Sequence, residues 1–357
     1  MSKHVYVGLS GGVDSSVTAA LLKEQGYTVT GVYMKNWSQD LPGFTCPWKA
    51  DFTDAKRVAV QLGIPFKMFD FEKEYRHKVV DYMVAEYQAG RTPNPDIMCN
   101  QEVKFKLFLD AALEDGADMI ATGHYARVEH STDQSGGITA ARMMKAADDN
   151  KDQTYFLYRV TEQALMRTLF PLGELTKPEV RQLAQKFGLI TAAKKESMGI
   201  CFVGKVGIKE FLLYELGPQA PGAIIDHNGK VVGEHDGAIF YTIGQRHGLD
   251  VGGGMPYYVV GKDMESNVVY VTTDISDERL WHMSFNMTST HWINDSPEPG
   301  AAVLVRTRHR APVVVASVHA DEKGAEVSLK DPLRALTPGQ SAVLYENGRV
   351  VGGGIII

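Results

Sequence analysis

The sequence contains few cysteines and no long apolar segment. Its 357 residues include only three cysteines, Cys46, Cys99 and Cys201, and no Cys-x-x-Cys pair. An odd, scattered set of this kind argues against a disulfide framework or a zinc ribbon, and it favours a reducing compartment. No apolar run approaches the ~20 residues that span a membrane, and a strand-like segment begins at His4. We therefore expect a cytoplasmic protein without a signal or transit peptide.

The charge is also not that of a dedicated nucleic-acid-binding chain. Charged residues make up 22% of the sequence, hydrophobic residues 44%, and the formal net charge is −6. These values are typical of a globular protein, so a nucleic-acid partner would have to bind a local basic surface. Because one core rarely grows beyond ~250–300 residues, the length predicts two or three domains.

Two common nucleotide-binding motifs are absent, and a third kind of turn is present. The sequence has neither the Gly-Lys-Ser/Thr ending of a Walker A loop nor a Gly-x-Gly-x-x-Gly fingerprint. The glycine-rich turn over residues 8–16 follows an apolar run and precedes a helical pattern that stops near Gly26. A strand, a Gly/Ser turn and a helix N-terminus together form an anion site. Gly11 and Gly12 allow close approach of a ligand, and Asp14 could hold a metal ion or a ribose.

The order of the expected elements changes along the chain. Up to about residue 190, strand-like and helix-like segments alternate, which predicts an α/β fold with a parallel sheet and helices on both faces. After about residue 220, short β-branched runs are separated by turns, including the hairpin signals Asn228-Gly229 and Asn347-Gly348. We expect an antiparallel β region made of a small linking domain and a terminal barrel. The expected elements cover residues 4–9, 13–26, 27–34, 53–62, 65–71, 72–88, 105–113, 118–121, 176–188, 231–232, 268–272, 303–306 and 313–318.

The segment over residues 90–102 combines prolines with polar side chains. Pro93 and Pro95 fix their own φ angles and extend the residues before them, which predicts a stiff loop. This loop would present Asn94 and Asp96, whose side chains can form hydrogen bonds with the edge of a base.

Cys99 and Cys201 lie where reactive cysteines are found. Cys99 stands directly before Asn100, which we interpret as the N-cap of a following helix, and a helix N-terminus lowers the pKa of a nearby thiol. Cys201 lies in a glycine-flanked turn after Lys194-Lys195, and nearby cations also favour thiolate. The alternative for Cys99 is a small buried core residue, a common environment of free cysteine.

Together these motifs resemble one known family. Ser-Gly-Gly-x-Asp-Ser over residues 10–15 resembles the PP-loop of ATP pyrophosphatases, which cut ATP between the α- and β-phosphates and adenylate an oxygen atom. From residue 8 to beyond 340 the chain resembles the tRNA-specific 2-thiouridylases, which make 2-thiouridine at the wobble position of certain tRNAs. The resemblance implies a PP-loop domain over residues 1–205, a small central β-containing domain over 206–275 and a C-terminal β-barrel over 276–357. The matching motifs are 10–15, 90–96, Cys99-Asn100, 123–125, 151–157, 199–202 and 241–246.

The chemistry implied by this resemblance is an ATP-dependent thiolation. The C2 oxygen of the uridine would attack the α-phosphorus of ATP and release pyrophosphate, with Mg²⁺ offsetting the phosphate charge. Cys201 would carry sulfur as a persulfide received from a sulfur-relay protein, and Cys99 would attack that persulfide or resolve it as a disulfide. No metal site within the protein and no tightly bound prosthetic group are implied. The implied ATP-binding residues are Gly8, Leu9, Ser10, Gly11, Gly12, Val13, Asp14, Ser15, Met34 and Gly123.

The resemblance also implies binding of tRNAs of the glutamate, lysine and glutamine types, and we expect a monomer. Residues 94–96 would face the target base. Alternation along a strand would place Arg306, Arg308 and Arg310 on one face, as a basic stripe suited to phosphates; the alternative is a solvated strand face. The implied tRNA-binding residues are Asn94, Pro95, Asp96, His124, Lys151, Asp152, Gln153, Arg308, His309 and Gln340.

Three other functions fit part of the sequence. Another PP-loop adenylating enzyme, such as an amidotransferase synthetase or argininosuccinate synthetase, would need ATP but no cysteine. A non-catalytic tRNA- or nucleotide-binding module would bind ATP without releasing pyrophosphate. An iron–sulfur tRNA thiolase would use Cys46, Cys99 and Cys201 as ligands, and its visible absorbance would be lost on Cys46→Ser.

Overall fold

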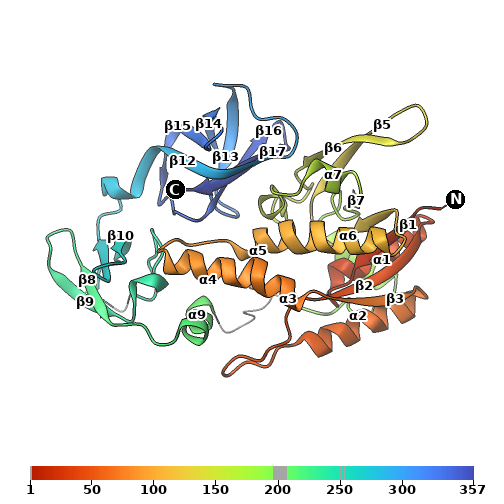
Figure 1. Cartoon of the computed structure of the whole chain (residues 1–357), viewed down its shortest axis with the longest axis horizontal. Helices are drawn as coiled ribbons and strands as arrows, with labels where there is room; N and C mark the ends of the chain where they lie inside the picture. The colour runs from red at the N-terminus through yellow and green to blue at the C-terminus, as the bar shows by residue number, and fades with distance from the viewer. Residues whose placement is uncertain (1, 196–206, 250, 253) are drawn as a thin grey trace.

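The described part of the chain forms three sheets. The computed structural model of the chain describes residues 2–195, 207–249, 251–252 and 254–357. Figure 1 shows the first sheet with its helices at one end of the molecule, the middle sheet at the other end, and a barrel above the helices that lie between them. The first sheet has five strands and the middle sheet has four. Within the part of the chain that the structure describes, no helix is long and apolar enough to cross a membrane.

The first sheet is parallel, with the strand order β3-β2-β1-β4-β7. Its central strand, β1 (His4–Gly8), is buried from Val5 onwards, because helices cover a parallel sheet on both faces. The order reverses beside β1, between β2 (Thr28–Lys35) and β4 (Met119–Ala121). In open α/β sheets ligands bind at such a switch point, outside the carboxyl ends of the strands. The remaining strands are β3 (Phe66–Asp70) and β7 (Thr168–Leu169).

The helices on this sheet follow the sequence signals, with one early start. α1 (Val13–Glu24) follows β1 after the turn over residues 9–12. α2 (Trp48–Leu62) begins earlier than the predicted residue 53 and ends, as predicted, at Gly63, which has φ 61°. α8 (Lys177–Lys186) begins at the predicted capping box of Thr176 and Glu179.

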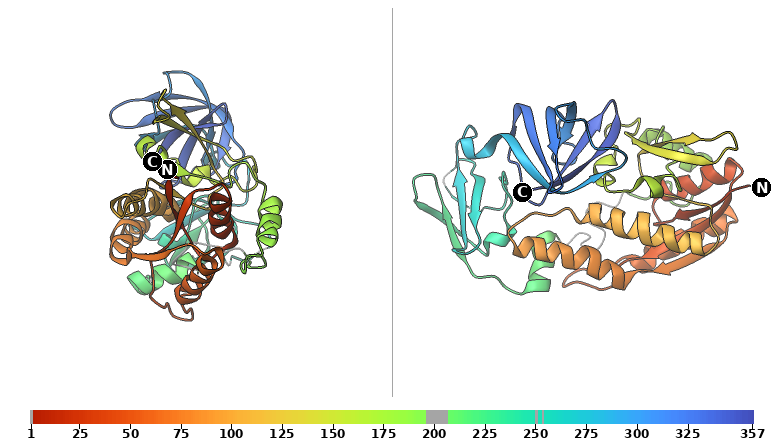
Figure 2. Two further views of the ribbon diagram at one scale, coloured as in Figure 1. Left: turned by 90° about the vertical axis from the view of Figure 1, so that its right-hand side faces the viewer. Right: turned by 45° about the horizontal axis from the view of Figure 1, so that its top comes forward.

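Two long helices connect the ends of the molecule (Figure 2). The first is continuous over 72–88, as predicted, and contains α3 (Glu72–Tyr75), the π-helical η1 (Arg76–Val80) and α4 (Asp81–Gln88). The second contains α5 (Pro95–Met98), the π-helical η2 (Cys99–Leu107) and α6 (Phe108–Glu114). Wide π-helical turns occur often at functional sites. Shorter helices are η3 (Thr154–Phe156), α7 (Glu162–Leu165) and α9 (Ile208–Leu216).

The prediction that Asn100 is a helix N-cap is therefore wrong. The helix begins at Pro95, with Asn94 as the N-cap residue, and Asn100 lies inside it. Proline is favoured in the first helical turn, because its fixed φ suits the helix and its missing N–H would have no partner there. The prolines therefore do not produce a stiff loop that continues to Cys99. Instead, the helix begins earlier, at Pro95.

A hairpin in the first region has no counterpart among the expected elements. β5 (Arg127–Thr132) pairs antiparallel with β6 (Ile138–Met144). Met144 also pairs with Arg349 of the barrel, so this hairpin extends the barrel sheet. The expected strict alternation of strands and helices up to residue 190 is interrupted here.

The middle sheet has the order β10-β11-β8-β9. The hairpin predicted at Asn228-Gly229 joins β8 (Gly222–Ile225) to β9 (Val231–His235). The prediction of a purely antiparallel region is wrong at one pairing, because β8 and β11 (Val268–Thr272) run parallel. Parallel neighbours need a long crossover, and the chain between them supplies it. The other elements are η4 (Ala238–Phe240) and β10 (Tyr258–Asp263).

The C-terminal strands close into the predicted barrel. The order β12-β15-β14-β13-β16-β17 is completed by pairing of β17 with β12. Asn347, with φ 50°, and Gly348, with φ 81°, form the predicted hairpin turn between β16 and β17. The elements are η5 (Glu278–Leu280), β12 (Trp281–Trp292), β13 (Ala302–Arg306), β14 (Val314–Ala320), β15 (Ala325–Arg334), β16 (Ser341–Glu346) and β17 (Arg349–Ile356).

One apolar cluster joins the regions. It runs from the long helices, through Tyr155 and Tyr158, to Val343 and Tyr345 of the barrel, and it also includes Phe211 of α9. Burial of these side chains fixes the barrel and α9 against the helices of the parallel sheet, and so determines which surfaces meet near the carboxyl ends of its strands.

Candidate functional site

The turn after β1 is folded by its own serine side chains. The Ser10 N–H donates to Ser15 Oγ at 3.1 Å, and Ser15 Oγ donates to the Gly12 carbonyl at 3.2 Å. Gly11 has φ +74°, and a Cβ there would lie 2.4 Å from the Asp51 carbonyl oxygen, so this position requires glycine. N–H groups of the first turn of a helix lack intrahelical partners, and the turn leads directly into those of α1. The geometry is that of an anion-binding turn.

Met34 and Gly123 lie against this turn. A Cβ on Gly8 would come 2.9 Å from Met34 Cε, and a Cβ on Gly123 would come 2.7 Å from the Ser15 nitrogen. Met34 belongs to β2, and Gly123 follows β4, the two strands that flank β1. The structure therefore brings the predicted ATP-binding residues together at one edge of the sheet.

The Asp14 carboxylate contacts two residues that the sequence analysis did not assign to the site. Lys177 Nζ lies 2.7 Å from Asp14 Oδ1 and 2.9 Å from Oδ2. The Tyr125 hydroxyl donates to Asp14 Oδ1 at 3.0 Å. Because 163 residues separate Lys177 from Asp14, no local sequence pattern could have identified this pair.

The helix of Cys99 contacts the nucleotide side through His124. Cys99 is 3% exposed and belongs to the largest core cluster. Phe105, on the same helix, packs against the His124 ring with centroids 5.7 Å apart. Thr122 Oγ1 lies 2.8 Å from His124 Nδ1. Burial, and to a lesser extent the charge of Lys104, hold the pKa of His124 well below its usual value, so the ring is neutral at pH 7.

Asn94 and Asp96 stand at the start of the Cys99 helix. Asn94 is the N-cap residue, yet among the described residues its side chain makes no cap hydrogen bond. Burial raises the pKa of Asp96, and the positive charge of Lys104 opposes that rise. Two polar side chains on either side of Pro95 are thus held at the beginning of a helix.

The chain just before Asn94 is held by the other two regions. The Thr92 N–H donates to the Pro338 carbonyl at 2.9 Å, and the Thr92 carbonyl accepts from Gln340 Nε2 at 2.8 Å. Thr92 Oγ1 lies 3.1 Å from Oγ1 of Thr242, which belongs to the central region. Gln340, a predicted tRNA contact, therefore also positions the loop of Asn94.

Residues 151–153 link the His124 turn to the barrel. Gln153 Oε1 accepts from the Tyr125 N–H at 2.9 Å. Asp152, which is 1% exposed, lies 3.6 Å from the Arg306 guanidinium of β13. A buried carboxylate needs such a partner, so Asp152 has a structural role at this junction.

The predicted basic stripe over residues 305–310 is wrong. β13 ends at Arg306, and Arg310 has φ +64°, so the three arginines do not share the face of one strand. Arg308 Nη2 donates to two main-chain carbonyls, one in the central region and one in the barrel, each at 2.9 Å. Arg310 is exposed, whereas Arg306 and Arg308 are half-buried. The chain leaves the strand direction after Arg306. Contacts with buried partners, and not strand alternation, orient the guanidinium groups of Arg306 and Arg308.

His309 packs at the junction between the barrel and the Cys99 helix. Its ring lies 4.5 Å, between centroids, from that of Phe156. The Phe156 carbonyl in turn accepts from Asn100 Nδ2 at 3.0 Å, directly beside Cys99. Burial, with the charges of Arg310 and Arg306, lowers the pKa of His309 to about 4.

Of the two remaining cysteines, Cys46 is the one that the structure describes. Cys201 and its flanking turn lie outside the described residues. Cys46 Sγ lies 3.7 Å from the Trp37 carbonyl, and burial raises the pKa of this thiol. Among residues with described positions, no three His, Cys, Asp or Glu side chains gather as a metal site. Asp14, a single carboxylate at a phosphate-binding turn, fits the way Mg²⁺ is held with nucleotides, by few protein ligands plus phosphate and water.

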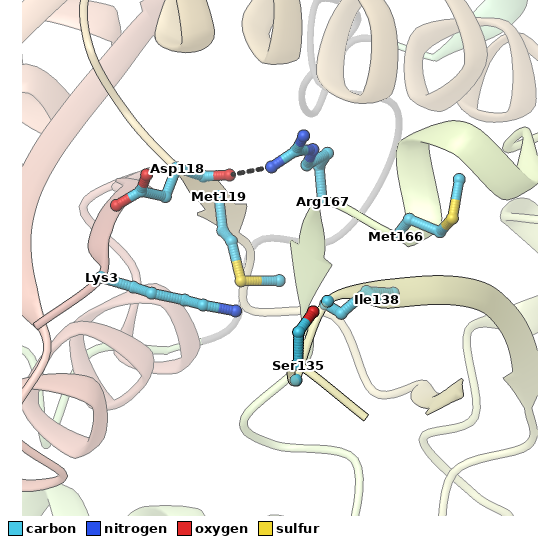
Figure 3. A pocket seen from close by; sticks show the side chains of 9 residues that line it. Lys3, Asp118, Met119, Ser135, Ile138, Met166 and Arg167 are labelled. Carbon is cyan, nitrogen blue, oxygen red and sulfur yellow. Dashed lines mark hydrogen bonds between the residues drawn. The ribbon is translucent and has the colours of Figure 1, made fainter. Parts of the chain in front are cut away.

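A cavity of about 480 Å³ lies at the opposite edge of the parallel sheet (Figure 3). It is lined by Lys3, which precedes β1, and by Met119 and Arg167. The Arg167 guanidinium donates to the Asp118 carbonyl at 3.5 Å. Because ligands of open α/β sheets bind at the carboxyl ends of the strands, this cavity at the amino ends is not the candidate site.

Three family descriptions match successive parts of the chain. The family "tRNA methyl transferase HUP domain" matches residues 3–205, "tRNA methyl transferase PRC-barrel domain" matches 209–273, and "Aminomethyltransferase beta-barrel domain" matches 282–356. These matches follow the parallel sheet, the middle sheet and the barrel in order.

Curated relatives match the chain over almost its whole length. Proteins named tRNA-specific 2-thiouridylase from Geobacillus kaustophilus and Geobacillus thermodenitrificans are each 48% identical to it, over 99% of this chain and 94% of theirs. One from Enterococcus faecalis is 46% identical over the same shares. A solved NMN synthetase from Francisella tularensis, 17% identical with a TM-score of 0.34 over 55% of this chain and 66% of its own, is too distant to add to this result. The chain belongs to the family of tRNA-specific 2-thiouridylases.

Proposed function

We propose that this protein uses ATP to convert the wobble uridine of tRNA into 2-thiouridine. One observation carries the proposal: the nucleotide turn, His124 and the helix of Cys99 converge at the carboxyl edge of the parallel sheet. Adenylation and sulfur transfer must act on the same carbon of one base, so their residues have to be neighbours. Family membership and the printed names of the relatives support the same substrate.

In the first step the uridine becomes activated. Residues 8–15 bind the phosphates of ATP, and Met34 and Gly123 contact the nucleoside. The uridine C2 oxygen forms a bond to the α-phosphorus, while the bond from this phosphorus to the bridging oxygen breaks and pyrophosphate leaves with the electron pair. Mg²⁺, held by Asp14 and phosphate oxygens, would offset the negative charge.

In the second step sulfur replaces the activated oxygen. A sulfur-relay protein loads Cys201 with a persulfide, whose outer sulfur forms the new bond to C2 as AMP leaves. The Cys99 thiolate attacks Sγ of Cys201, either to release that outer sulfur as sulfide or to free it from the enzyme after it has bonded to C2. Both routes end in a Cys99–Cys201 disulfide, which a cellular thiol must reduce before the next turnover.

The tRNA would lie along the junction of the parallel sheet, the central region and the barrel. Residues 94–96 face the target base. The side-chain amide of Asn94 suits this role because, within the described part of the chain, it makes no cap hydrogen bond. His124, Lys151 and Gln153 contact the RNA beside the nucleotide, and the buried Asp152 holds this segment against Arg306. On the barrel side Arg308, His309 and Gln340 shape the RNA-binding surface, and the exposed Arg310 contacts a phosphate. We propose a cytoplasmic monomer, with domains over 1–205, 206–275 and 276–357, that modifies tRNAs of the glutamate, lysine and glutamine types.

Incubation with substrate tests the whole proposal. The purified protein is incubated with unmodified tRNA, ATP, Mg²⁺, a persulfide donor and a thiol reductant, and the nucleosides are analysed by mass spectrometry alongside AMP and pyrophosphate. We expect one oxygen of the wobble uridine to be replaced by sulfur only when ATP is present. Release of AMP without thiolation would favour another PP-loop adenylating enzyme. Binding of ATP without release of pyrophosphate would favour a non-catalytic module.

A further inference from the structure

Lys177 is fixed at one end of a helix that packs on the nucleotide helix. It is the first residue of α8, directly after the N-cap residue Thr176, whose capping box is completed by Glu179. Its N–H donates to Asp148 Oδ2 at 3.0 Å. Apolar side chains of α1 and α8, among them Val17 and Val180, are buried in one cluster, so the two helices hold a fixed relation. The Lys177 side chain is therefore aimed at the start of α1 by its backbone.

Two lysines connect α8 to α1, and they differ in surroundings. Lys177 pairs with Asp14 at the start of α1, and only 11% of its side chain is exposed. Lys186 pairs with Glu24 at the other end of α1 at 3.6 Å, and 66% of its side chain is exposed. An exposed pair such as Lys186–Glu24 contributes little to stability. The molecule thus contains a sheltered lysine at the phosphate-binding turn and an exposed lysine on the same helix for comparison.

The negative charge of Asp14 has other stabilising contacts besides the ion pair with Lys177. Asp14 lies in the first turn of α1, where the helix dipole already favours a negative charge, and it also accepts from the Tyr125 hydroxyl. A partly buried ion pair is by itself weak evidence of a stabilising role. A lysine is a compact charge on a flexible stem, so it can move from a carboxylate to phosphate oxygens over a short distance.

We propose that Lys177 is the cation that binds the pyrophosphate part of ATP, beside the turn over residues 8–15. The inference rests on the proposed use of ATP. It adds a ligand-binding residue that lies 163 residues from Asp14 in the sequence. As the uridine oxygen bonds to the α-phosphorus, negative charge accumulates on the β-phosphate oxygens of the leaving group. An ammonium group held beside the N-terminus of α1 stabilises that charge without a proton transfer.

The test is binding of magnesium pyrophosphate and of AMP, each measured by isothermal titration calorimetry on the full chain. Lys177→Met should weaken pyrophosphate binding about 10- to 100-fold, the usual worth of a charged hydrogen bond, and change AMP binding less than about twofold. Lys177→Arg keeps the charge and should recover most of the affinity. Lys186→Met, the matched control, should bind both ligands like the wild type. Tyr125→Phe removes a contact to Asp14 but no cation, and should leave pyrophosphate binding within about threefold of the wild type.

Several results would overturn the inference. One is binding of pyrophosphate by Lys177→Met with wild-type affinity. Another is an equal loss of AMP and pyrophosphate binding in both Lys177→Met and Lys177→Arg. Wild-type protein that binds AMP but not magnesium pyrophosphate would also contradict it. If Lys177→Met does not fold, the same comparison is made with Lys177→Gln. The titrations contain no tRNA, so their outcome does not depend on the proposed tRNA substrate. A wild type that fails to thiolate tRNA but shows the expected pyrophosphate pattern would therefore reject the proposed substrate and leave the role of Lys177 standing.

Discussion

The nucleotide turn and the junction with the barrel are built in different ways. In the turn, Ser10 and Ser15 are five residues apart, and their hydrogen bonds close within one short segment. At the junction, Gln340 reaches Thr92 across 248 residues, and the Tyr155 hydroxyl reaches the Ser341 carbonyl across 186. A short segment can carry its own geometry, whereas the junction exists only once the core has packed. Changes in the turn should therefore act on ATP directly, and changes at the junction should act on stability and on tRNA.

The largest effect is expected at Cys99, on the junction side. Cys99→Ser is nearly isosteric in the buried helix but can neither attack a persulfide nor form a disulfide, so thiolation should fall at least about 1,000-fold. ATP binding, set by the turn, should be unchanged. Nucleoside mass spectrometry and ATP titration check the two halves of this prediction.

The matched control is Cys46→Ser, which should keep its thiolation activity. Its thiol contacts the Trp37 carbonyl, and its pKa is raised by burial, so it is poorly suited to nucleophilic attack. Normal activity of Cys99→Ser would reject the two-cysteine mechanism. Loss of activity in Cys46→Ser as well would point to a cluster with three cysteine ligands.

The next effect is expected in the turn itself. A methyl group at Gly123 would press on the first turn of α1, 2.7 Å from the Ser15 nitrogen, so Gly123→Ala should weaken ATP binding about tenfold or more and cost about 1–3 kcal/mol of unfolding free energy. Calorimetric titration and thermal unfolding measure the two quantities. Gly261→Ala, where the nearest atom would be at 3.6 Å, should change neither. Unaltered ATP affinity in Gly123→Ala would show that the turn does not bind the nucleotide.

The arginines of the barrel separate stability from RNA binding. Arg308→Lys loses contacts with two main-chain carbonyls and should lower the unfolding free energy by about 1–3 kcal/mol, with little change in the salt dependence of tRNA binding. The exposed Arg310, changed to Gln, should do the reverse: stability within about 0.5 kcal/mol and a slope of log K against log salt that is shallower by about one. Denaturant unfolding measures the stabilities, and tRNA binding at several salt concentrations measures the slopes. A loss of stability in Arg310→Gln, or a shallower slope in Arg308→Lys, would contradict this prediction.

The smallest effect concerns pH. Burial lowers the pKa of His309 to about 4 from the ordinary value near 6.5, so between these values the unfolded chain binds a proton that the folded chain does not. Stability must then decrease as the pH falls through this window. His309→Phe keeps the ring contact with Phe156 and should lose less stability on acidification, by about 1 kcal/mol at pH 5 for this half-buried group. Parallel curves for both proteins between pH 7 and 5 would contradict the assignment.

Local patterns predicted the parts of the fold whose geometry is local. The strand, turn and helix over residues 4–24, the capping box at Thr176 and the hairpin turn at Asn347-Gly348 depend on neighbours in sequence, and all were confirmed. The interpretation of Asn100 as an N-cap was wrong because Pro95 starts the helix first. The hairpin of β5 and β6 was missed because its pairing with the barrel stabilises it from outside the segment.

The candidate site likewise combines one part that local sequence determines with other parts that depend on tertiary packing. The sequence by itself determined the phosphate-binding turn, because a Gly/Ser turn between a buried strand and a helix has few alternative conformations. Only the tertiary structure decided that Lys177 meets Asp14, that Arg308 turns inward, and that the loop of Asn94 is held by Gln340. These contacts join segments that are far apart in the chain, and burial of the shared apolar core, not any local preference, selects which of them meet.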